Sequence, residues 1–277
     1  MTKIKKIALQ QKRSQAINIL KQLSSVIVAL SGGVDSAVVA ALAFEALKDK
    51  AMAVTFDSPL ITPQEIKDAR AIADSIGIRH QVHVLDELKI DAISKNPENR
   101  CYHCKLHRFQ LAQELARKLG FEAVVDGSTA SDIGEHRPGL QAIEELKIIS
   151  PLQEAGITKE EARWLAHDFQ LPVANKPSNS CLATRVPYNE PLTKERLTRI
   201  AAAEKAIHEI TSVDLLRVRD HGVLARIEVT RRDFPRFLKK NNAQKIVKKL
   251  MALGYKFVTI DLQGYRFGSF DDEQKYK

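Results

Sequence analysis

Hydrophobic positions in the first half of the chain follow two alternating patterns. Short runs rich in β-branched residues are typical of buried strands, and the stretches between them repeat apolar residues at helical spacing. The predicted strands cover residues 26–30, 51–56, 81–85, 122–126 and 146–150, and the predicted helices cover residues 37–48, 63–76, 103–119 and 159–169. Strands that alternate with helices predict an α/β fold with a doubly wound parallel sheet, covered by helices on both faces.

The pattern changes after Lys176. Residues 176–192 are rich in Pro, Ser and Asn, which is typical of an irregular loop. Beyond this loop we predict helices at about 193–210 and 232–253 and strands at 215–219, 224–229 and 257–262. These elements predict a smaller C-terminal α+β domain. We place the division so that residues 1–188 form the first domain and residues 189–277 the second.

Composition places the chain among ordinary globular proteins. Hydrophobic residues make up 44% of its 277 residues and charged residues 28%, which is enough to bury a core. No apolar run approaches the roughly 20 residues that span a bilayer. The basic N-terminus lacks the apolar core of a secretory signal, and three cysteines do not form a paired set. We therefore expect a cytoplasmic protein with no membrane partner.

The formal charge of +9 fits a polyanionic partner, either a nucleic acid or a small nucleotide. Much of the excess lies in residues 231–249, which we interpret as a solvated helix face. Aromatic residues make up only 6%, so no stacking platform for single-stranded nucleic acid is evident. The composition therefore favours a small-molecule nucleotide substrate over nucleic acid.

The segment Ser31-Gly32-Gly33-Val34-Asp35-Ser36 joins the first predicted strand directly to the first predicted helix. Two glycines let the backbone turn sharply and bring its N–H groups close to an anion. The helix that follows points its positive end at the same place. The two serines add hydroxyl donors, and a carboxylate beside phosphates makes sense mainly as a Mg²⁺ ligand. The segment ends without the Gly-Lys-Ser/Thr of a Walker A loop.

In this context SGGVDS resembles the signature of the PP-loop ATP pyrophosphatases. The resemblance implies an adenine nucleotide alpha hydrolase-like fold, ATP cleaved between its α and β phosphates, and transfer of AMP to a substrate oxygen. Ligands of open α/β sheets lie beyond the carboxyl ends of the strands. Asp57 ends the second predicted strand, and Asp126 and Gly127 end the fourth. These three residues are candidates for adenosine and Mg²⁺ contacts.

Two of the three cysteines lie close together in the segment Cys101-Tyr102-His103-Cys104, just before a predicted helix. The third, Cys181, lies far downstream in the irregular loop. Three thiolates would leave one iron of a 4Fe-4S cluster without a protein ligand, since a full set takes four. Such an iron could carry a sulfide to an activated substrate. Zinc with a nearby histidine and a redox dithiol at Cys101 and Cys104 are the alternatives that the residues leave open.

Several segments together resemble the LarE family, whose members are ATP-dependent sulfur transferases of nickel-pincer nucleotide cofactor biosynthesis. The segments are SGGVDS, residues 126–139 (DGSTASDIGEHRPG), 176–188 (KPSNSCLATRVPY), 201–205 (AAAEK), 216–222 (LRVRDHG) and 261–268 (DLQGYRFG). The resemblance implies adenylation of the carboxylates of pyridinium biscarboxylic acid mononucleotide and their conversion to thiocarboxylates. It also implies assembly into homo-oligomers and cooperation with the other enzymes of that pathway.

The resemblance implies two ways of supplying sulfur. Some members sacrifice the sulfur of the cysteine that matches Cys181, and others hold a 4Fe-4S cluster with that cysteine and a Cys-x-x-Cys pair. Because this chain has all three cysteines, we predict the cluster type, with sacrifice of Cys181 as the alternative. Cys181, Asp35 and Glu204 are the predicted catalytic residues.

Arginines in the same segments predict where the substrate phosphate binds, because guanidinium groups bind phosphate through paired hydrogen bonds. The candidates are Arg185, Arg217, Arg219 and Arg266, with Arg137 as a further anion contact. Two rival functions stay open. One is tRNA thiolation by a related PP-loop enzyme, and the other is an ATP-binding sensor that does not turn ATP over.

Overall fold

The structure is a computed structural model that describes residues 3–133, 138–266 and 270. The chain divides into two compact units. Unit 1 consists of Met1–Ser58, Pro63–Leu85 and Asn99–Asn179. Unit 2 consists of Pro59–Thr62, Asp86–Glu98 and Ser180–Lys277.

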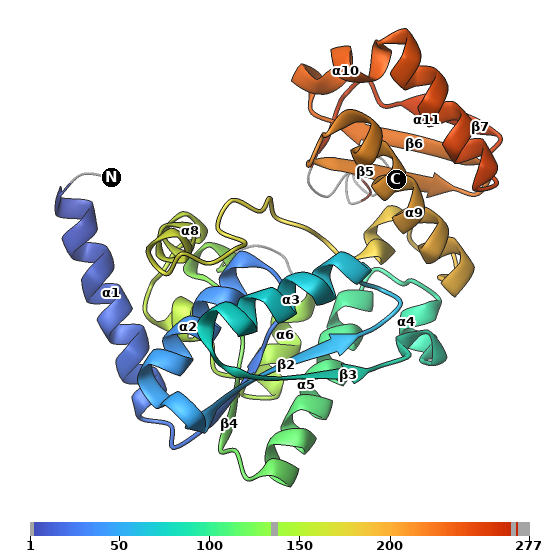
Figure 1. Ribbon diagram of the computed structural model, residues 1–277. Helices are drawn as coiled ribbons and strands as arrows, with labels where there is room; N and C mark the ends of the chain where they lie inside the picture. Colours follow the sequence, from blue (N-terminus) through green and yellow to red (C-terminus); the bar gives the residue numbers. More distant parts are fainter. Residues whose placement is uncertain (1–2, 134–137, 267–269, 271–277) are drawn as a thin grey trace. The chain divides into compact units, whose positions relative to one another are not determined.

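Unit 1 is built on a parallel sheet with the strand order β3-β2-β1-β4 (Figure 1). Its strands are β1 (Val26–Ala29), β2 (Ala51–Asp57), β3 (Arg79–Val84) and β4 (Ala123–Val125). Strand β1 lies between β2 and β4, so the chain winds outward from it in both directions. The prediction of a doubly wound α/β fold is therefore confirmed.

The predicted strand at 146–150 is wrong. Only Ile149 pairs, through a single parallel bridge to Val125. Lys147 has a φ of 53°, and this left-handed conformation interrupts the extended backbone that a strand needs. The rest of the segment therefore does not join the sheet.

Helices cover both faces of the sheet in unit 1. They are α1 (Lys3–Lys21), α2 (Val34–Leu47), α3 (Pro63–Ile76), α5 (Arg100–Leu119), α6 (Pro138–Glu145), α7 (Pro151–Glu154) and α8 (Lys159–Asp168), with short 3₁₀ turns at Lys48–Lys50 and Ala130–Asp132. Val26 and Val28 of β1 are fully buried in one core with α1, α2, α3 and α8. Ile27 points to the opposite face, into a second core with α5 and α6. This alternation is what the period of two along a strand dictates.

Helix α1 was not predicted, although its buried residues carry the signal. Leu9, Ala16 and Leu20 are spaced by seven and four residues and are all buried, which is helical spacing. The basic residues around them drew attention to charge instead. In the described part of the chain, no helix has the length and apolarity that a membrane span requires.

Unit 2 contains a mixed sheet with the strand order β5-β6-β7. Strands β5 (Leu216–His221) and β6 (Leu224–Val229) are antiparallel, and β7 (Phe257–Ile260) is parallel to β6. The helices are α4 (Asp91–Ser94), α9 (Lys194–Thr211), α10 (Phe234–Leu238) and α11 (Lys240–Ala252), and 3₁₀ turns occur at Glu87–Lys89, Leu182–Arg185 and Arg231–Asp233. Helices and strands share one hydrophobic core, which confirms the predicted α+β character.

The predicted helix at 232–253 is instead two helices that meet at Lys239, where the backbone is extended (φ −55°, ψ 125°). Phe237 and Ile246 are both buried in the core of unit 2. They are nine residues apart, so in one continuous helix they would point about 180° away from each other. The break lets both side chains reach the core.

Candidate functional site

The loop between β1 and α2 has the geometry of an anion-binding turn. Gly32 has a φ of +74°, and a Cβ atom at this position would lie 2.5 Å from the carbonyl oxygen of Glu65 in α3. Gly33 is extended (φ −97°, ψ 167°) and forms the N-cap of α2. The first amides of a helix have no partner within the helix. They are therefore available to a phosphate placed at this turn.

The two serines of the loop hold its ends together. The Ser36 hydroxyl accepts a hydrogen bond from the Ser31 amide (3.1 Å) and lies 3.0 Å from the Ser31 hydroxyl. It donates in turn to the Gly33 carbonyl (3.2 Å). Ser36 is buried, so these hydroxyls shape the loop.

The end of β4 touches this loop. A Cβ atom on Gly127 would lie 2.7 Å from the Ser36 amide nitrogen, so only glycine fits there. Asp126 is buried and accepts hydrogen bonds from the hydroxyls of Ser128 (2.6 Å) and Ser150 (2.6 Å). Its carboxylate thus fixes the path of the chain around Gly127. Asp57 is exposed at the carboxyl end of β2.

Asp35 lies in the first turn of α2, beside the loop. One carboxylate therefore lies in the first turn of α2, and that of Asp57 lies at the carboxyl end of β2. Hard oxygen ligands of this kind suit Mg²⁺. Arg137, the further candidate for an anion contact, lies outside the described residues.

The structure places the Cys-x-x-Cys pair inside a helix and not before it as predicted. Cys101 and Cys104 lie in the first turns of α5, three residues apart, and both are partly buried. Residues at this spacing share a helix face. Arg100 Nη2 approaches the Cys101 sulfur at 3.7 Å.

Cys181 belongs to unit 2, where it forms the N-cap of the 3₁₀ turn Leu182–Arg185. Across residues 3–133 and 138–266, no three His, Cys, Asp or Glu side chains form a group that could hold a metal ion. Two of the three predicted cluster ligands thus lie in unit 1, on one face of α5, and Cys181 belongs to unit 2.

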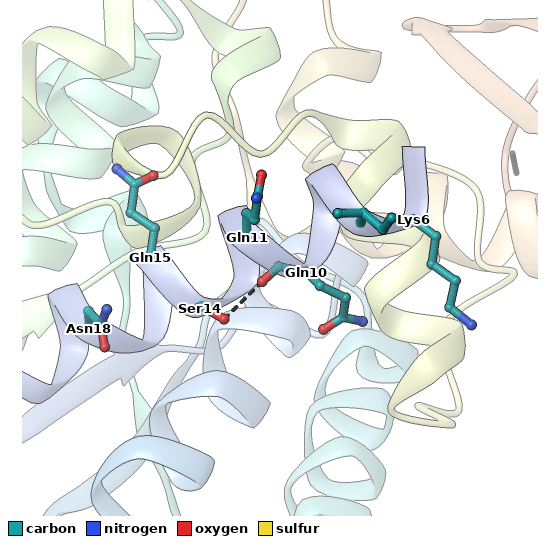
Figure 2. A pocket seen from close by; sticks show the side chains of 7 residues that line it. Lys6, Gln10, Gln11, Ser14, Gln15 and Asn18 are labelled. Carbon is teal, nitrogen blue, oxygen red and sulfur yellow. Dashed lines mark hydrogen bonds between the residues drawn. The ribbon is translucent and has the colours of Figure 1, made fainter. Parts of the chain in front are cut away.

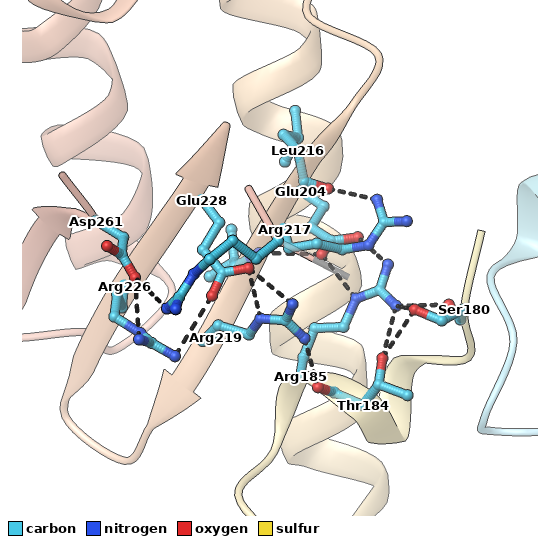
Figure 3. Close-up of polar contacts among 12 residues, drawn as sticks. Ser180, Thr184, Arg185, Glu204, Leu216, Arg217, Arg219, Arg226, Glu228 and Asp261 are labelled. Carbon is cyan, nitrogen blue, oxygen red and sulfur yellow. Dashed lines mark hydrogen bonds and ion pairs between the residues drawn. The ribbon is translucent and has the colours of Figure 1, made fainter. Parts of the chain in front are cut away.

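Arg185 fixes the loop that carries Cys181. It is fully buried, and its Nε and Nη2 atoms donate to the two carboxylate oxygens of Glu204 in α9, at 2.9 and 3.1 Å (Figure 3). Its Nη1 atom donates to the carbonyl oxygens of Ser180 (2.5 Å) and Cys181 (2.9 Å). Glu204 also accepts from the Val218 amide at 3.0 Å. Arg185, itself held by its ion pair with Glu204, thus fixes the carbonyl group that precedes Cys181 and the carbonyl group of Cys181 itself.

Arg217 and Arg219 of β5 lie in the same cluster, which Figure 3 shows from the side of the sheet. Arg219 donates to Glu228 through Nε (2.9 Å) and Nη2 (2.7 Å), and to the Thr184 carbonyl oxygen (2.6 Å). Arg217 is 5% exposed. Burial, with the charge of Arg185 adding to it, lowers the pKa of Arg217 to about 10. Arg217 therefore keeps its charge at neutral pH in surroundings that disfavour a cation.

The cluster extends along β6 to residues that were not predicted. Arg226 bridges Glu228 (3.4 Å) and Asp261 (3.1 Å), and Arg266 lies 3.9 Å from the Asp261 carboxylate. Arg226 and Glu228 alternate along β6 as Arg217 and Arg219 do along β5. Polar residues that alternate within an apolar strand are the sequence signal that would have found them. Within the described part of the cluster, the four predicted arginines and Arg226 surround three carboxylates.

A separate hollow of about 750 Å³ lies along α1 (Figure 2). The residues that line it are Lys6, Ile7, Gln10, Gln11, Ser14, Gln15 and Asn18, all from this one helix. None of the predicted site residues contributes to it, so it is not the candidate site.

Comparison with known proteins places these features in a family. The NAD synthase family matches residues 12–118, which include the loop between β1 and α2. An uncharacterized protein of Synechocystis is 38% identical over 250 residues, which cover 90% of this chain and 93% of that protein. The pyridinium-3,5-bisthiocarboxylic acid mononucleotide synthase of Lactiplantibacillus plantarum is 34% identical over 265 residues, 95% of each chain. The chain belongs to the LarE family.

Similarity to other PP-loop proteins is shorter. The tRNA-specific 2-thiouridylase MnmA of Rickettsia felis is 30% identical over 201 residues, which cover 59% of this LarE-family chain and 54% of that protein. The similarity to the synthase spans both units, whereas this one does not cover the whole chain. The LarE resemblance therefore covers most of both units.

Proposed function

We propose that this protein is an ATP-dependent sulfur transferase that converts carboxylates of pyridinium-3,5-biscarboxylic acid mononucleotide to thiocarboxylates. The observation that carries the proposal is the 34% identity to a named synthase of this product along 95% of both chains. The anion-binding turn at Gly32 and Gly33 and the buried arginines of unit 2 support it, because both the cosubstrate and the substrate carry phosphate.

The first stage is adenylation. The backbone amides at the start of α2 bind the β and γ phosphates, and a substrate carboxylate oxygen attacks the α phosphorus. The bond between the α phosphorus and the bridging oxygen breaks, and pyrophosphate leaves. Asp35 and Asp57 would hold Mg²⁺, which would neutralise the charge of the phosphates. AMP is then a good leaving group on the substrate carbonyl carbon.

The second stage is sulfur transfer. A sulfur nucleophile attacks the carbonyl carbon, and the bond to the AMP oxygen breaks. Cys181 is the residue that we propose for this position, since the ion pair of Arg185 and Glu204 holds its loop. Its thiolate would form a thioester as AMP leaves. Loss of the Cα proton and cleavage of the Cys181 Cβ–Sγ bond would then release the thiocarboxylate and leave dehydroalanine at this position. Cys101 and Cys104 share a helix face and would suit two thiolate positions of a 4Fe-4S cluster.

Arg217, Arg219 and Arg266 would bind the phosphate of the substrate nucleotide. A phosphate dianion would relieve the unfavourable burial that lowers the pKa of Arg217. Glu204 would act as a positioning residue through Arg185. We further propose that the protein works in the cytoplasm as a homo-oligomer, together with the enzymes that supply its substrate and consume its product.

The first test is iron and acid-labile sulfide on protein purified without oxygen, for wild type and Cys101→Ala. About four irons per chain, lost in the variant, would support a cluster held in part by Cys101. An iron-free, folded sample that produces thiocarboxylate once per chain, with Cys181 losing the mass of one sulfur, would support sacrifice. Release of pyrophosphate without any thiocarboxylate product would contradict sulfur transfer altogether.

The second candidate function is tRNA thiolation, and the similarity to tRNA-specific 2-thiouridylase favours it. Pyrophosphate release that depends on tRNA, and is absent with the mononucleotide, would establish this rival. Binding of ATP with no pyrophosphate release under either condition would instead indicate an ATP sensor.

A further inference from the structure

Lys176 forms a hydrogen bond to the backbone of the nucleotide loop. Its Nζ atom donates to the carbonyl oxygen of Gly32 (2.9 Å) and to Asp68 in α3 (2.5 Å). The side chains of Lys176 and Asp68 are 22% and 18% exposed. The other oxygen of Asp68 accepts from Gln64 at 2.7 Å. The ammonium group therefore has a fixed carboxylate on one side and a loop carbonyl on the other.

The backbone of Lys176 is itself anchored. Arg163 in α8 donates to the carbonyl oxygens of Lys176 (2.7 Å) and Ala174 (3.2 Å). Asn179 reaches Glu65 in the first turn of α3 at 3.4 Å. The segment 174–179 thus forms a strap across unit 1, with its lysine on the Gly32 carbonyl. All of these residues belong to unit 1.

The hydrogen bond from Lys176 to the Gly32 carbonyl oxygen fixes the orientation of the peptide plane between Gly32 and Gly33. The carbonyl of Gly32 and the amide N–H of Gly33 belong to one trans peptide plane and point in opposite directions. With glycine on both sides, this plane can rotate at little steric cost. A cation bound to the Gly32 oxygen fixes the plane, and therefore directs the Gly33 N–H away from Lys176.

We propose that Lys176 is a positioning residue for the pyrophosphate group of ATP, which acts by locking the Gly32–Gly33 peptide with its N–H toward the phosphates. The effect is specific to the part of ATP that leaves as pyrophosphate. AMP has no β or γ phosphate, so its binding does not depend on this peptide. The proposal rests on the proposed function in that the loop is taken to bind these phosphates.

The test is calorimetric binding of inorganic pyrophosphate, ATP and AMP to wild type, Lys176→Met and Lys176→Arg. We expect Lys176→Met to weaken pyrophosphate and ATP binding about 10-fold or more, the value of one lost charge-directed hydrogen bond, and to leave AMP binding within about 2-fold. Lys176→Arg keeps a donor and should recover part of the loss. In turnover, the KM for ATP should rise more than kcat falls.

Lys12→Met is the matched control. Lys12 is also a partly exposed lysine of unit 1, and it donates to Glu161 at 2.8 Å without touching the loop. It should lose as little stability as Lys176→Met and bind all three ligands as wild type does. If Lys176→Met does not fold, Asp68→Asn is the second variant, because it keeps the shape of the side chain and removes the charge that fixes the Lys176 ammonium group. It should weaken pyrophosphate and ATP binding by a smaller factor and leave AMP binding unchanged.

Pyrophosphate binding by Lys176→Met equal to that of wild type would overturn the proposal, and so would an equal loss of pyrophosphate and AMP binding. The proposed function fails separately. A wild-type protein that binds ATP and pyrophosphate, but never forms thiocarboxylate, would contradict sulfur transfer and leave the role of Lys176 intact.

Discussion

The nucleotide loop of unit 1 and the arginine cluster of unit 2 are both proposed to bind an anion, but they are built from different parts of the polypeptide. The loop uses backbone amides, and side chains are excluded at Gly32 and Gly127 because neighbouring backbone leaves no room for a Cβ atom. The cluster uses long charged side chains that are almost fully buried, Arg185, Arg217 and Arg219 among them. A site made of backbone amides should lose anion binding when a side chain is added to one of its glycines. A site made of charged side chains should lose anion binding when one of the charges is removed.

The largest expected effect is that of Gly32→Ala. The new methyl group would lie 2.5 Å from the Glu65 carbonyl oxygen, so α3 or the loop must move. We expect pyrophosphate release to fall by about 100-fold or more, since displacements of about 1 Å at a reacting group have that effect. The measurement is steady-state pyrophosphate release with the mononucleotide substrate.

Gly120→Ala is the control for backbone strain. Gly120 has a φ of +73° and nothing within 4 Å of a Cβ position, so the strain is the same and the clash is absent. We expect it to lose about 1–2 kcal/mol of stability and to retain full turnover. Equal turnover in Gly32→Ala and Gly120→Ala would show that the tight contact with α3 is unimportant.

The next largest effect is that of Arg185→Met on stability. It leaves Glu204, whose side chain is 14% exposed, without its ion-pair partner. Breaking one side of a buried pair costs about 3–5 kcal/mol, which urea denaturation would measure. Replacing both Arg185 and Glu204 with Met should recover most of this loss. A loss below about 1 kcal/mol for the single variant would mean that the pair does not hold the Cys181 loop.

Arg217→Met should separate binding from stability. The folded-state pKa of about 10 lies below the ordinary pKa of an arginine, so at any pH below 10 the charge on Arg217 opposes folding. Its removal should leave stability unchanged or increased, while the KM for the mononucleotide rises about 10- to 100-fold. Thermal unfolding and substrate titration measure the two effects.

Arg196→Met is the opposite case in unit 2. Arg196 donates to the buried Asp220 at 2.7 Å, so its loss should reduce stability and leave the KM unaltered. The same behaviour in both arginine variants would contradict a phosphate-binding role for Arg217.

The smallest effect expected is that of Ser36→Ala. The hydroxyl shapes the loop through Ser31 and Gly33, but the amides that bind phosphate remain. We expect the KM for ATP to rise about 10-fold, the value of one or two neutral hydrogen bonds. Ser14→Ala, on the exposed face of α1, is the control. An effect as large as that of Gly32→Ala would mean that this hydroxyl binds phosphate itself.

The sequence predicts local features of the fold well and distant pairings poorly. The strand, turn and helix around Gly32 follow from neighbouring residues, because hydrophobic period and glycine content act locally. The single bridge at Ile149 in unit 1 depends on the left-handed conformation of Lys147. The break at Lys239 depends on which side chains the core of unit 2 buries. Neither the bridge nor the helix break can be predicted from the residues immediately around it.

The same distinction applies to the site. The loop residues, Cys181 and the arginines of β5 carry family-like motifs, and their residue types indicate anion and sulfur chemistry. Lys176 and Asp68 were missed because they meet over 108 positions of sequence, and neither residue is unusual in its own surroundings. Arg185 was predicted to bind substrate, and its side chain donates to Glu204 and to the carbonyl oxygens of Ser180 and Cys181. That role stays a prediction.

The division of the chain between the units has a consequence for its synthesis on the ribosome. Unit 2 takes Pro59–Thr62 and Asp86–Glu98 from the first half of the chain. The Leu60 carbonyl oxygen accepts from the Leu182 amide at 2.8 Å, and Asn96 pairs with Asn189 at 2.9 Å. During synthesis these two segments leave the ribosome before residues 180–277, so they cannot yet form their native contacts. A chain truncated after residue 179 would lack both of these partners, so unit 2 is expected to reach its native state only when residues 180–277 have also been synthesised.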